Sequence, residues 1–282
     1  MSAAAGATFE GEALRWAPDG DVLVVTLHRE PGNALGLTAL AELEALVAHV
    51  GAGAGGARAL LFTSTARAGF CEGAALKELY TDLVARRAAG EAAGDTLAAV
   101  RSFIDRIHAV FDALDQAPMT TVAALHGVVF GGGFELALTC DVLIADKGAR
   151  FAFPELRLGL IPGFGGVPRL RRDVGNAVVR DLLLSGRSLS ATRAHELGLV
   201  SQVVARGEAL PAALALAKQA ARFAPHTVAA AKRFTKPLPE GLDAEKALFC
   251  ELFGSPVVLE ALARFAADTS ALPYLPSERV PS

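Results

Sequence analysis

Short apolar runs alternate along the chain with longer segments whose apolar residues recur every three or four positions. The apolar runs over Val22–Leu27, Ala59–Phe62 and Thr120–Leu125 predict buried β-strands. Helical spacing over Leu37–Val50 and Leu97–Leu114 predicts helices between the strands. Because strands alternate with helices, the pattern favours an α/β core in which strands pair in parallel.

The alternation ends near residue 204, and only helical spacing follows it. Helices are expected over 208–223, 226–234 and 242–267, the last with a break at Gly254-Ser255-Pro256. We therefore expect a core over residues 1–204, a helical C-terminal region over 205–270 and a loosely held tail over 271–282.

Local residue choices set three smaller expectations. Asp19-Gly20 supplies the positive φ angles of a tight turn and predicts a β-hairpin. Segment 86–95, rich in small and charged residues, predicts a mobile loop or a weak helix. A small basic cluster is expected to form a solvated helix face; its members are Arg169, Arg171 and Arg172.

Composition narrows the class of protein. Hydrophobic residues make up 52% and charged residues 20% of 282 residues, which is typical of a globular chain. A net charge of −3 argues against nucleic-acid binding as the main role. Charged residues, glycine and proline interrupt every apolar run, so no membrane span is expected. The first residues lack the basic and apolar regions of a secretory signal.

The cysteines and histidines suggest no metal or nucleophile chemistry. Three scattered cysteines without a CxxC spacing predict neither disulfides nor a zinc site, which fits a reducing cytoplasm. Cys71 has a glutamate neighbour and no basic partner, so a nucleophilic role is rejected. His126 lies at a strand end without a nucleophile elbow, and a structural role is expected for it.

Three consecutive glycines, Gly131 to Gly133, separate an apolar strand-like run from an apolar helical run, and Glu135 follows them. Such a turn can aim backbone N–H groups at an anion or a developing oxyanion. It matches neither the dinucleotide fingerprint nor the P-loop. Alternatively, the turn only lets strand and helix pack closely while Glu135 is solvated; the turn alone leaves both interpretations open.

Two further segments carry candidate groups. Glu155 follows Pro154 at a predicted strand end, beside a Gly/Pro-rich stretch over 159–166. In Phe70-Cys71-Glu72-Gly73-Ala74-Ala75-Leu76-Lys77, a glycine before a helix can present the Ala74 N–H, with Lys77 one turn inside. Taken singly, a surface loop and an ordinary helix start are the favoured interpretations.

Taken in order, these segments resemble the crotonase (enoyl-CoA hydratase/isomerase) superfamily, and most closely its two-glutamate hydratases. The matching stretches are FCEGAALKEL, HGVVFGGGFELALTCDVLIA, ARFAFPELRLGLIPGFGGVPRL and LLLSGRSLSATRAHELGLVSQVV, and the likeness covers about residues 10 to 268. The resemblance implies an α/β fold of ββα units wound as a spiral, with a helical C-terminal region used for trimerisation. A homotrimer or a dimer of trimers is therefore expected.

The resemblance also implies an acyl-CoA thioester as substrate. Backbone N–H groups of Ala74 and Gly132 would form an oxyanion hole, and Glu135 and Glu155 would handle the water and the α-proton. Contacts to the thioester and its CoA are expected from Ala74, Ala75, Leu76, Lys77 and Gly132. CoA enters only as part of the substrate, and neither a metal nor a redox cofactor is expected.

The presence of both glutamates favours reversible hydration of a 2-enoyl-CoA. An enoyl-CoA isomerase or an acyl-thioester hydrolase of the same fold is the alternative. A non-catalytic protein that binds acyl-CoA, a partner protein or RNA is an alternative of another class. Three departures leave the acyl group and the carrier, CoA or acyl-carrier protein, open: Ala75 replaces a common aspartate, segment 79–105 beside the acyl pocket is long, and the C-terminal end lacks a basic pair.

Overall fold

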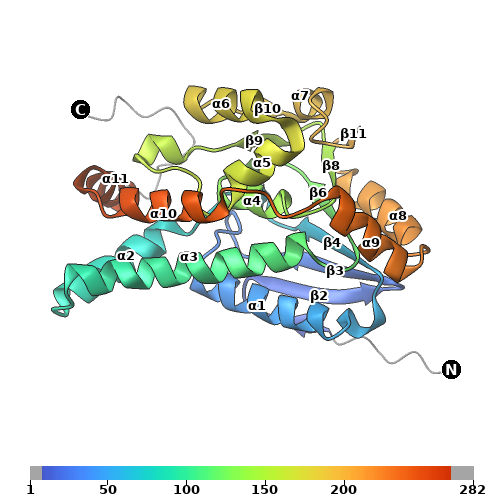
Figure 1. Cartoon of the computed structure of the whole chain (residues 1–282), viewed down its shortest axis with the longest axis horizontal. Helices are drawn as coiled ribbons and strands as arrows, with labels where there is room; N and C mark the ends of the chain where they lie inside the picture. The colour runs from blue at the N-terminus through green and yellow to red at the C-terminus, as the bar shows by residue number, and fades with distance from the viewer. Residues whose placement is uncertain (1–7, 268–282) are drawn as a thin grey trace.

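Two β-sheets form the centre of the protein in a computed structural model that describes residues 8–267 (Figure 1). The larger sheet has seven strands in the order β1-β2-β3-β4-β6-β8-β11, and the smaller has four in the order β10-β9-β7-β5. The strands are β1 (Phe9–Glu10), β2 (Leu14–Asp19), β3 (Val22–Leu27), β4 (Ala59–Ser64), β5 (Gly69–Cys71), β6 (Thr120–Leu125), β7 (Val128–Phe130), β8 (Val142–Asp146), β9 (Arg150–Ala152), β10 (Leu189–Ser190) and β11 (Gln202–Val204).

Eleven α-helices surround these sheets in the described range. They are α1 (Leu37–Gly51), α2 (Leu76–Ala88), α3 (Ala93–Asp115), α4 (Gly132–Ala137), α5 (Gly166–Val174), α6 (Asn176–Ser185), α7 (Ala191–Glu196), α8 (Ala209–Ala220), α9 (Pro225–Thr235), α10 (Leu242–Phe253) and α11 (Pro256–Ala267). Two short 3-10 helices are η1 (Ala54–Gly56) and η2 (Glu155–Leu158). The break between α10 and α11 confirms the expected interruption near Gly254.

Three pairs of consecutive strands, β4/β5, β6/β7 and β8/β9, each have one strand in the larger sheet and one in the smaller sheet. β4, β6 and β8 are parallel neighbours in the larger sheet, while β5, β7 and β9 are parallel neighbours in the smaller one. Each pair therefore places one strand in each sheet before the chain moves on, which is the repeated ββα winding expected from the sequence. The turn after β9, the turn after β7 and the loop after β5 consequently fall along one edge of the smaller sheet.

The central strands of the larger sheet are buried on both faces. Along β4, Leu60 and Phe62 belong to the main core, whereas Ala59 and Leu61 pack in a second cluster beneath α8. Alternate residues of a strand point to opposite faces, so covering both faces requires an almost continuous apolar run. That requirement explains why the sequence of β4 is uniformly apolar. Small alanines on α8 and at its C-terminal end allow the close approach: Ala209, Ala213, Ala217 and Ala221.

The predicted hairpin is confirmed, because β2 and β3 pair in antiparallel register around Gly20, which has φ +63°. Two short strands, however, differ from the expectation. The sequence predicts that β6 leads directly into the glycine turn, but the chain first turns at Gly127 and forms β7. Residues 69–71, for which the sequence predicts no strand, form β5. Each of these strands has only three residues, too few for an alternation to be visible in the sequence.

The segment expected to be a mobile loop or weak helix is mostly helical. Helix α2 continues to Ala88 and α3 begins at Ala93, so only a short connection remains inside 86–95. The hinge of this connection is Gly90, with φ +88°. Both helices are longer than the hydrophobic spacing indicates, since their ends near the hinge carry exposed residues.

No helix in the described part of the chain is long and apolar enough to cross a membrane. Cys71, Cys140 and Cys250 are free, and burial raises the pKa of Cys71 to about 12, which agrees with the rejection of a nucleophilic role. The predicted loose tail over 271–282 lies outside the described residues, and the cytoplasmic location stays a prediction.

Candidate active site

Two glycine-containing turns bring a pair of backbone N–H groups together. A Cβ atom placed on Gly132 would lie 3.3 Å from the Ala74 nitrogen, and one placed on Gly73 would lie 3.3 Å from the Gly132 nitrogen. Among the described residues, neither nitrogen has a backbone or side-chain acceptor. Ala74 precedes α2, and Gly132 begins α4. Two N–H groups at helix starts are therefore free to bind an oxygen that carries negative charge.

The glycines of this turn leave no room for side chains. Gly131 has φ +48°, and a Cβ atom there would come 2.5 Å from the Oε1 atom of Glu155. A Cβ atom on Gly132 would come 2.7 Å from the ring of Phe164. The turn therefore needs glycine both for its backbone angles and for the close approach of groups that line the site.

Glu135 extends from α4 and is only 1% exposed. Its Oε1 atom accepts hydrogen bonds from the backbone N–H groups of Phe164 and Gly166, both at 2.8 Å. Burial raises the pKa of Glu135 to about 7, and the two amide donors together with the charge of Arg169 limit the rise. The interpretation that Glu135 is solvated is therefore wrong, and this carboxyl group changes charge near neutral pH.

Glu155 begins η2, directly after β9 and Pro154. Its Oε2 atom is buried and has no hydrogen-bond partner in the described part of the chain. Burial, and then the neighbouring charge of Glu135, raise the pKa of Glu155 well above its usual value. The ionised form of Glu155 lacks the amide donors that the ionised form of Glu135 has, and this difference favours the proton on Glu155. In such a pair, the carboxyl group that keeps its proton can act as a general acid and the ionised one can act as a general base.

The four groups line one cavity of about 310 Å³. Its wall includes all the residues for which the sequence predicts a role: Ala74, Ala75, Leu76, Lys77, Gly132, Glu135 and Glu155. Apolar side chains complete it: Leu158, Leu160, Phe164, Phe249 and Phe265. Lys77 lies over the ring of Phe265, with its Nζ atom 4.7 Å from the ring centre. The cavity can therefore hold an apolar group with its polar end at the two N–H groups.

Phe249 and Phe265 are lining residues that the sequence reasoning missed. They lie in α10 and α11, which were assigned only to the C-terminal helical region. Among the described residues, none of segment 79–105 lines the cavity, although this segment was expected to border the acyl pocket. Helix α3 instead supports the wall from behind, because Phe103 packs edge-on against Phe164 with ring centres 5.8 Å apart.

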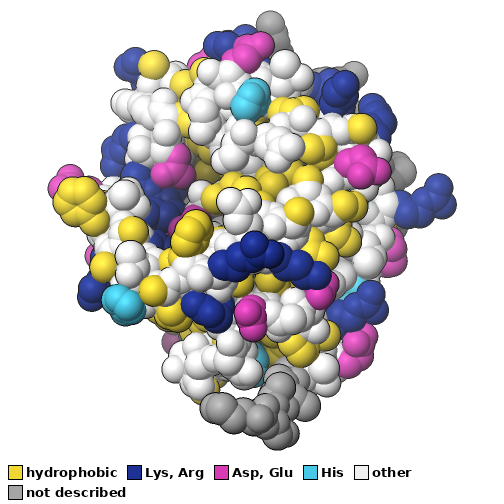
Figure 2. Space-filling view, turned by 90° about the vertical axis from the view of Figure 1, so that its right-hand side faces the viewer, with side chains coloured by type: hydrophobic (Ala, Val, Ile, Leu, Met, Phe, Trp, Pro, Cys, Tyr) yellow, Lys and Arg dark blue, Asp and Glu magenta, His cyan; other side chains and the backbone are white. Residues whose placement is uncertain are grey.

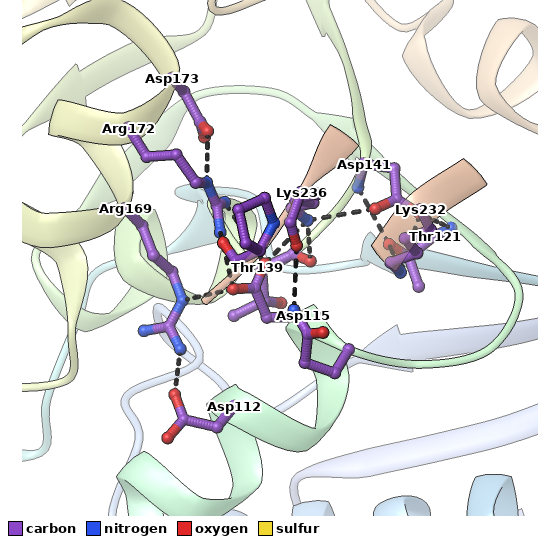
Figure 3. A network of polar contacts seen from close by, with 12 residues as sticks. Asp112, Asp115, Thr121, Thr139, Asp141, Arg169, Arg172, Asp173, Lys232 and Lys236 are labelled. Carbon is purple, nitrogen blue, oxygen red and sulfur yellow. Dashed lines mark hydrogen bonds and ion pairs between the residues drawn. The ribbon is translucent and has the colours of Figure 1, made fainter. Parts of the chain in front are cut away.

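Arg169 and Arg172 belong to a largely buried network rather than to a solvated helix face, so the expectation is wrong for these two residues (Figure 3). It is confirmed for Arg171, which is exposed. The Arg169 side chain is fully buried, and its guanidinium pairs with Asp112 at 2.5 Å and Asp115 at 3.4 Å. Arg172 and Lys236 also bind Asp115, each at a shortest distance between 2.8 and 2.9 Å. The acidic partners come from α3, more than 50 residues earlier, so no local pattern could reveal them.

This network supports the amides that hold Glu135. The Nη1 atom of Arg169 donates to the carbonyl oxygens of Phe164 at 3.1 Å and Gly165 at 3.2 Å. Those carbonyls belong to the same short loop whose N–H groups bind Glu135. The Gly165 carbonyl shares its peptide plane with the Gly166 N–H, so Arg169 orients one of the two donors and fixes the loop beside the other.

Comparison with known proteins decides the family. The sequence model of the enoyl-CoA hydratase/isomerase family matches residues 18–270. The chain belongs to the enoyl-CoA hydratase/isomerase family. It is 34% identical over 266 residues to a protein named "Probable enoyl-CoA hydratase" from Rhizobium meliloti (strain 1021), covering 92% of this chain and 97% of that protein.

Solved structures of this family share the fold. A crystal structure of enoyl-CoA hydratase from Bacillus anthracis matches with a TM-score of 0.69 at 31% identity, covering 90% of this chain and 96% of that one. The enoyl-CoA hydratase from Bacillus halodurans, at 22% identity, matches with a TM-score of 0.76 over 89% of this chain and 99% of that one. The crotonase fold expected from the sequence is thereby confirmed.

Proposed function

We propose that the protein catalyses the reversible addition of water to a 2-enoyl-CoA thioester. The observation that supports this most directly is the pair of carboxyl groups, Glu135 and Glu155, whose pKa values burial raises to different extents beside two free N–H groups. Hydration needs one group that takes a proton and one that gives a proton. It also needs donors for the negative charge that develops on the thioester oxygen.

In this proposal the thioester oxygen accepts hydrogen bonds from the N–H groups of Ala74 and Gly132. Addition of water at the β-carbon turns the thioester into an enolate, so the charge on that oxygen grows along the reaction. Donors that are already oriented in a cavity shielded from water stabilise this charge by roughly 3 kcal/mol each. The apolar cavity wall contributes by excluding water that would weaken the interaction.

Glu135, the more acidic carboxyl group, acts as the base and Glu155 as the acid. Glu135 removes a proton from water while the water oxygen bonds to the β-carbon, and Glu155 delivers its proton to the α-carbon. The proton now on Glu135 replaces the one that Glu155 gave up, and the cycle closes. The amides of Phe164 and Gly166 stabilise the ionised form of the base. No metal or redox cofactor takes part in this scheme.

The carrier and the assembly are part of the proposal. Lys77, in the first turn of α2, lines the cavity beside Phe265 and is suited to contact an anionic carrier such as CoA or the phosphopantetheine arm of an acyl-carrier protein. We further propose the trimer, or dimer of trimers, that the family resemblance implies. Exposed apolar side chains in the C-terminal helical region support an assembly, including Phe223 at 59% and Phe234 at 89% exposure.

Replacement of each glutamate by glutamine tests the assignment. Glu135→Gln and Glu155→Gln keep the shape of the side chain but remove the proton transfer, so each should lower the hydration rate by on the order of a hundredfold or more. The assay follows loss of the conjugated thioester with a panel of 2-enoyl-CoA substrates. Glu260→Gln, at an exposed position of α11, is the matched control and should keep full activity.

Near-full activity of both active-site variants on an accepted substrate would refute the assignment. A second candidate is isomerisation of a 3-enoyl-CoA, which one carboxyl group can perform by moving a proton between two carbons. The free Oε2 atom of Glu155 favours it, because the Oε1 atom of Glu135 already holds two amides. Product analysis with 2-enoyl and 3-enoyl substrates separates the two reactions, and release of free CoA would indicate hydrolysis instead.

A further inference from the structure

A third buried carboxyl group, Glu245 in α10, lies behind the site and outside the cavity wall. It is 7% exposed, and its Oε1 atom accepts a hydrogen bond from the backbone N–H of Val167 at 2.9 Å. Nothing in the sequence pattern distinguishes it from the other glutamates of the C-terminal helices. Its contact with the beginning of α5 connects it to the loop that holds Glu135.

Glu135 and Glu245 share the amide donors of one short stretch of chain. Glu135 takes the N–H groups of Phe164 and Gly166, and Glu245 takes that of the next residue, Val167. Gly166 and Val167 are the first two residues of α5, where N–H groups lack partners within the helix. The two carboxyl groups therefore bind adjacent backbone amides, so a shift of the turn at Glu245 would also move the donors that bind Glu135.

One face of α10 packs along the loop over 163–167. Leu242, Glu245 and Phe249 are spaced three and four residues apart, so they lie on the same side of the helix. A Cβ atom on Gly165 would come 2.8 Å from the Leu242 side chain, and one on Gly163 would come 2.4 Å from the Phe249 ring. The loop therefore lies tightly against α10, and Glu245 provides the polar contact at the centre of this face.

Charged and titratable groups face Glu245 from the neighbouring elements. From α3, His108 contacts the Gly163 carbonyl oxygen through Nε2 at 2.9 Å, and Asp112 pairs with Arg169 of α5. From α4, Glu135 lies close enough for its charge to act on Glu245. On α10 itself, Lys246 is paired with Asp105 and Asp243. The positive charge nearest the loop, Arg169, is thus already balanced by aspartates.

The surroundings favour a neutral Glu245. Its Oε2 atom is buried and has no hydrogen-bond partner among residues 8–267, so an ionised carboxylate would be poorly solvated there. Burial, and next the charge of Glu135, raise the pKa of Glu245 well above its usual value. These surroundings favour the protonated form of Glu245.

We propose that Glu245 is a positioning residue for the base: by accepting the Val167 N–H, it holds the first turn of α5 against α10 so that the Phe164 and Gly166 amides stay directed at Glu135. It acts through the loop and does not touch the substrate. The role in catalysis rests on the proposed hydration reaction, whereas the effect on the ionisation of Glu135 does not.

Two substitutions at 245 separate positioning from charge. Glu245→Gln keeps a carbonyl oxygen for the Val167 N–H and is permanently neutral, so kcat and the acidic limb of the pH–rate profile should stay within about twofold and a few tenths of a pH unit of wild type. Glu245→Ala removes the acceptor, so kcat should fall about tenfold with little change in KM. Its acidic limb should move to higher pH, because Glu135 loses ordered donors.

Two further variants complete the set. Glu251→Ala, at an exposed position of the same helix, is the control and should match wild type in every measurement. Glu245→Leu fills the space that alanine leaves and equally lacks an acceptor. It takes the place of Glu245→Ala if that variant does not fold.

Carboxyl ¹³C NMR of glutamate-labelled protein provides a readout that needs no substrate. The Glu135 signal, assigned by its loss in Glu135→Gln, should titrate at higher pH in Glu245→Ala or Glu245→Leu and unchanged in Glu245→Gln. This result would stand even if the wild-type protein hydrated no enoyl thioester. The proposal is overturned if Glu245→Gln shifts the titration as Glu245→Ala does, or if the variants without an acceptor leave it unchanged.

Discussion

At the scale of single residues, environment gives two side chains of one type two different chemistries. Glu135 is held by two amides beside a guanidinium, whereas the Oε2 atom of Glu155 has no partner in the described structure. Burial disfavours the charge of both, but only Glu135 receives donors that offset it. The division of roles between base and acid therefore follows from hydrogen bonding rather than from residue type.

The rate of hydration should accordingly depend on pH in a defined direction. The base must be ionised, and its pKa is raised to about 7, so kcat should fall as the pH drops through about 7. Glu155 must be protonated, and burial raises its pKa well above the usual value, so kcat should also fall on the basic side as Glu155 ionises. A pH–rate profile at saturating 2-enoyl-CoA measures both limbs. An acidic limb near pH 4.5, the usual value for glutamate, would contradict the assignment of Glu135.

The sequence could predict the polar groups that line the site, but neither the apolar residues Phe249 and Phe265 of its wall nor what supports it. Ala74, Gly132, Glu135 and Glu155 lie in motifs whose glycines and prolines mark turns, and the structure gathers them in one cavity. Arg169 and its aspartate partners are instead joined across more than 50 residues. Contacts at that separation depend on how helices pack, and no spacing along the chain encodes them.

At the scale of elements, length decides what the hydrophobic pattern reveals. Strands β3 and β4, each six residues long, have enough positions to show burial on one or both faces. Strands β5 and β7 have three residues each, yet they carry the two turns that supply Ala74 and Gly132. The elements nearest the site are thus the hardest to predict, because short strands align loops without needing long apolar runs.

Helix α10 shows a second limit of the hydrophobic pattern. Its apolar spacing predicts a helix correctly, and the face that carries Leu242, Glu245 and Phe249 packs on the loop over 163–167. A helix-period pattern states that one face is buried but not against which partner. The contribution of a C-terminal helix to the site therefore emerges only from the packing.

At the scale of the whole molecule, the surface suggests association. The side on which α8 and α9 lie in Figure 1 shows apolar side chains among Lys and Arg side chains (Figure 2). We expect light scattering after size exclusion to give a mass of about three or six times the 29.1 kDa chain. A mass equal to one chain at micromolar concentration would contradict the proposed trimer.

The buried carboxyl groups also have a consequence for folding. Glu135 would titrate near pH 4.5 in an unfolded chain and titrates near 7 in the folded one, so unfolding between these values releases a proton. Its contribution to stability is complete below about pH 4.5 and is lost as the pH rises through about 7, by on the order of 3 kcal/mol. Glu135→Gln lacks this loss because it cannot ionise.

Denaturant unfolding of wild type and Glu135→Gln at several pH values measures this difference. The free energy of unfolding of the variant should exceed that of wild type increasingly from about pH 4.5 to 7 and by a constant amount above 7. A difference that does not change with pH would show that Glu135 ionises alike in both states. The proposed reaction requires the ionised form of Glu135, whereas ionisation of Glu135 lowers the free energy of unfolding. The pH range of highest activity is therefore not that of greatest stability.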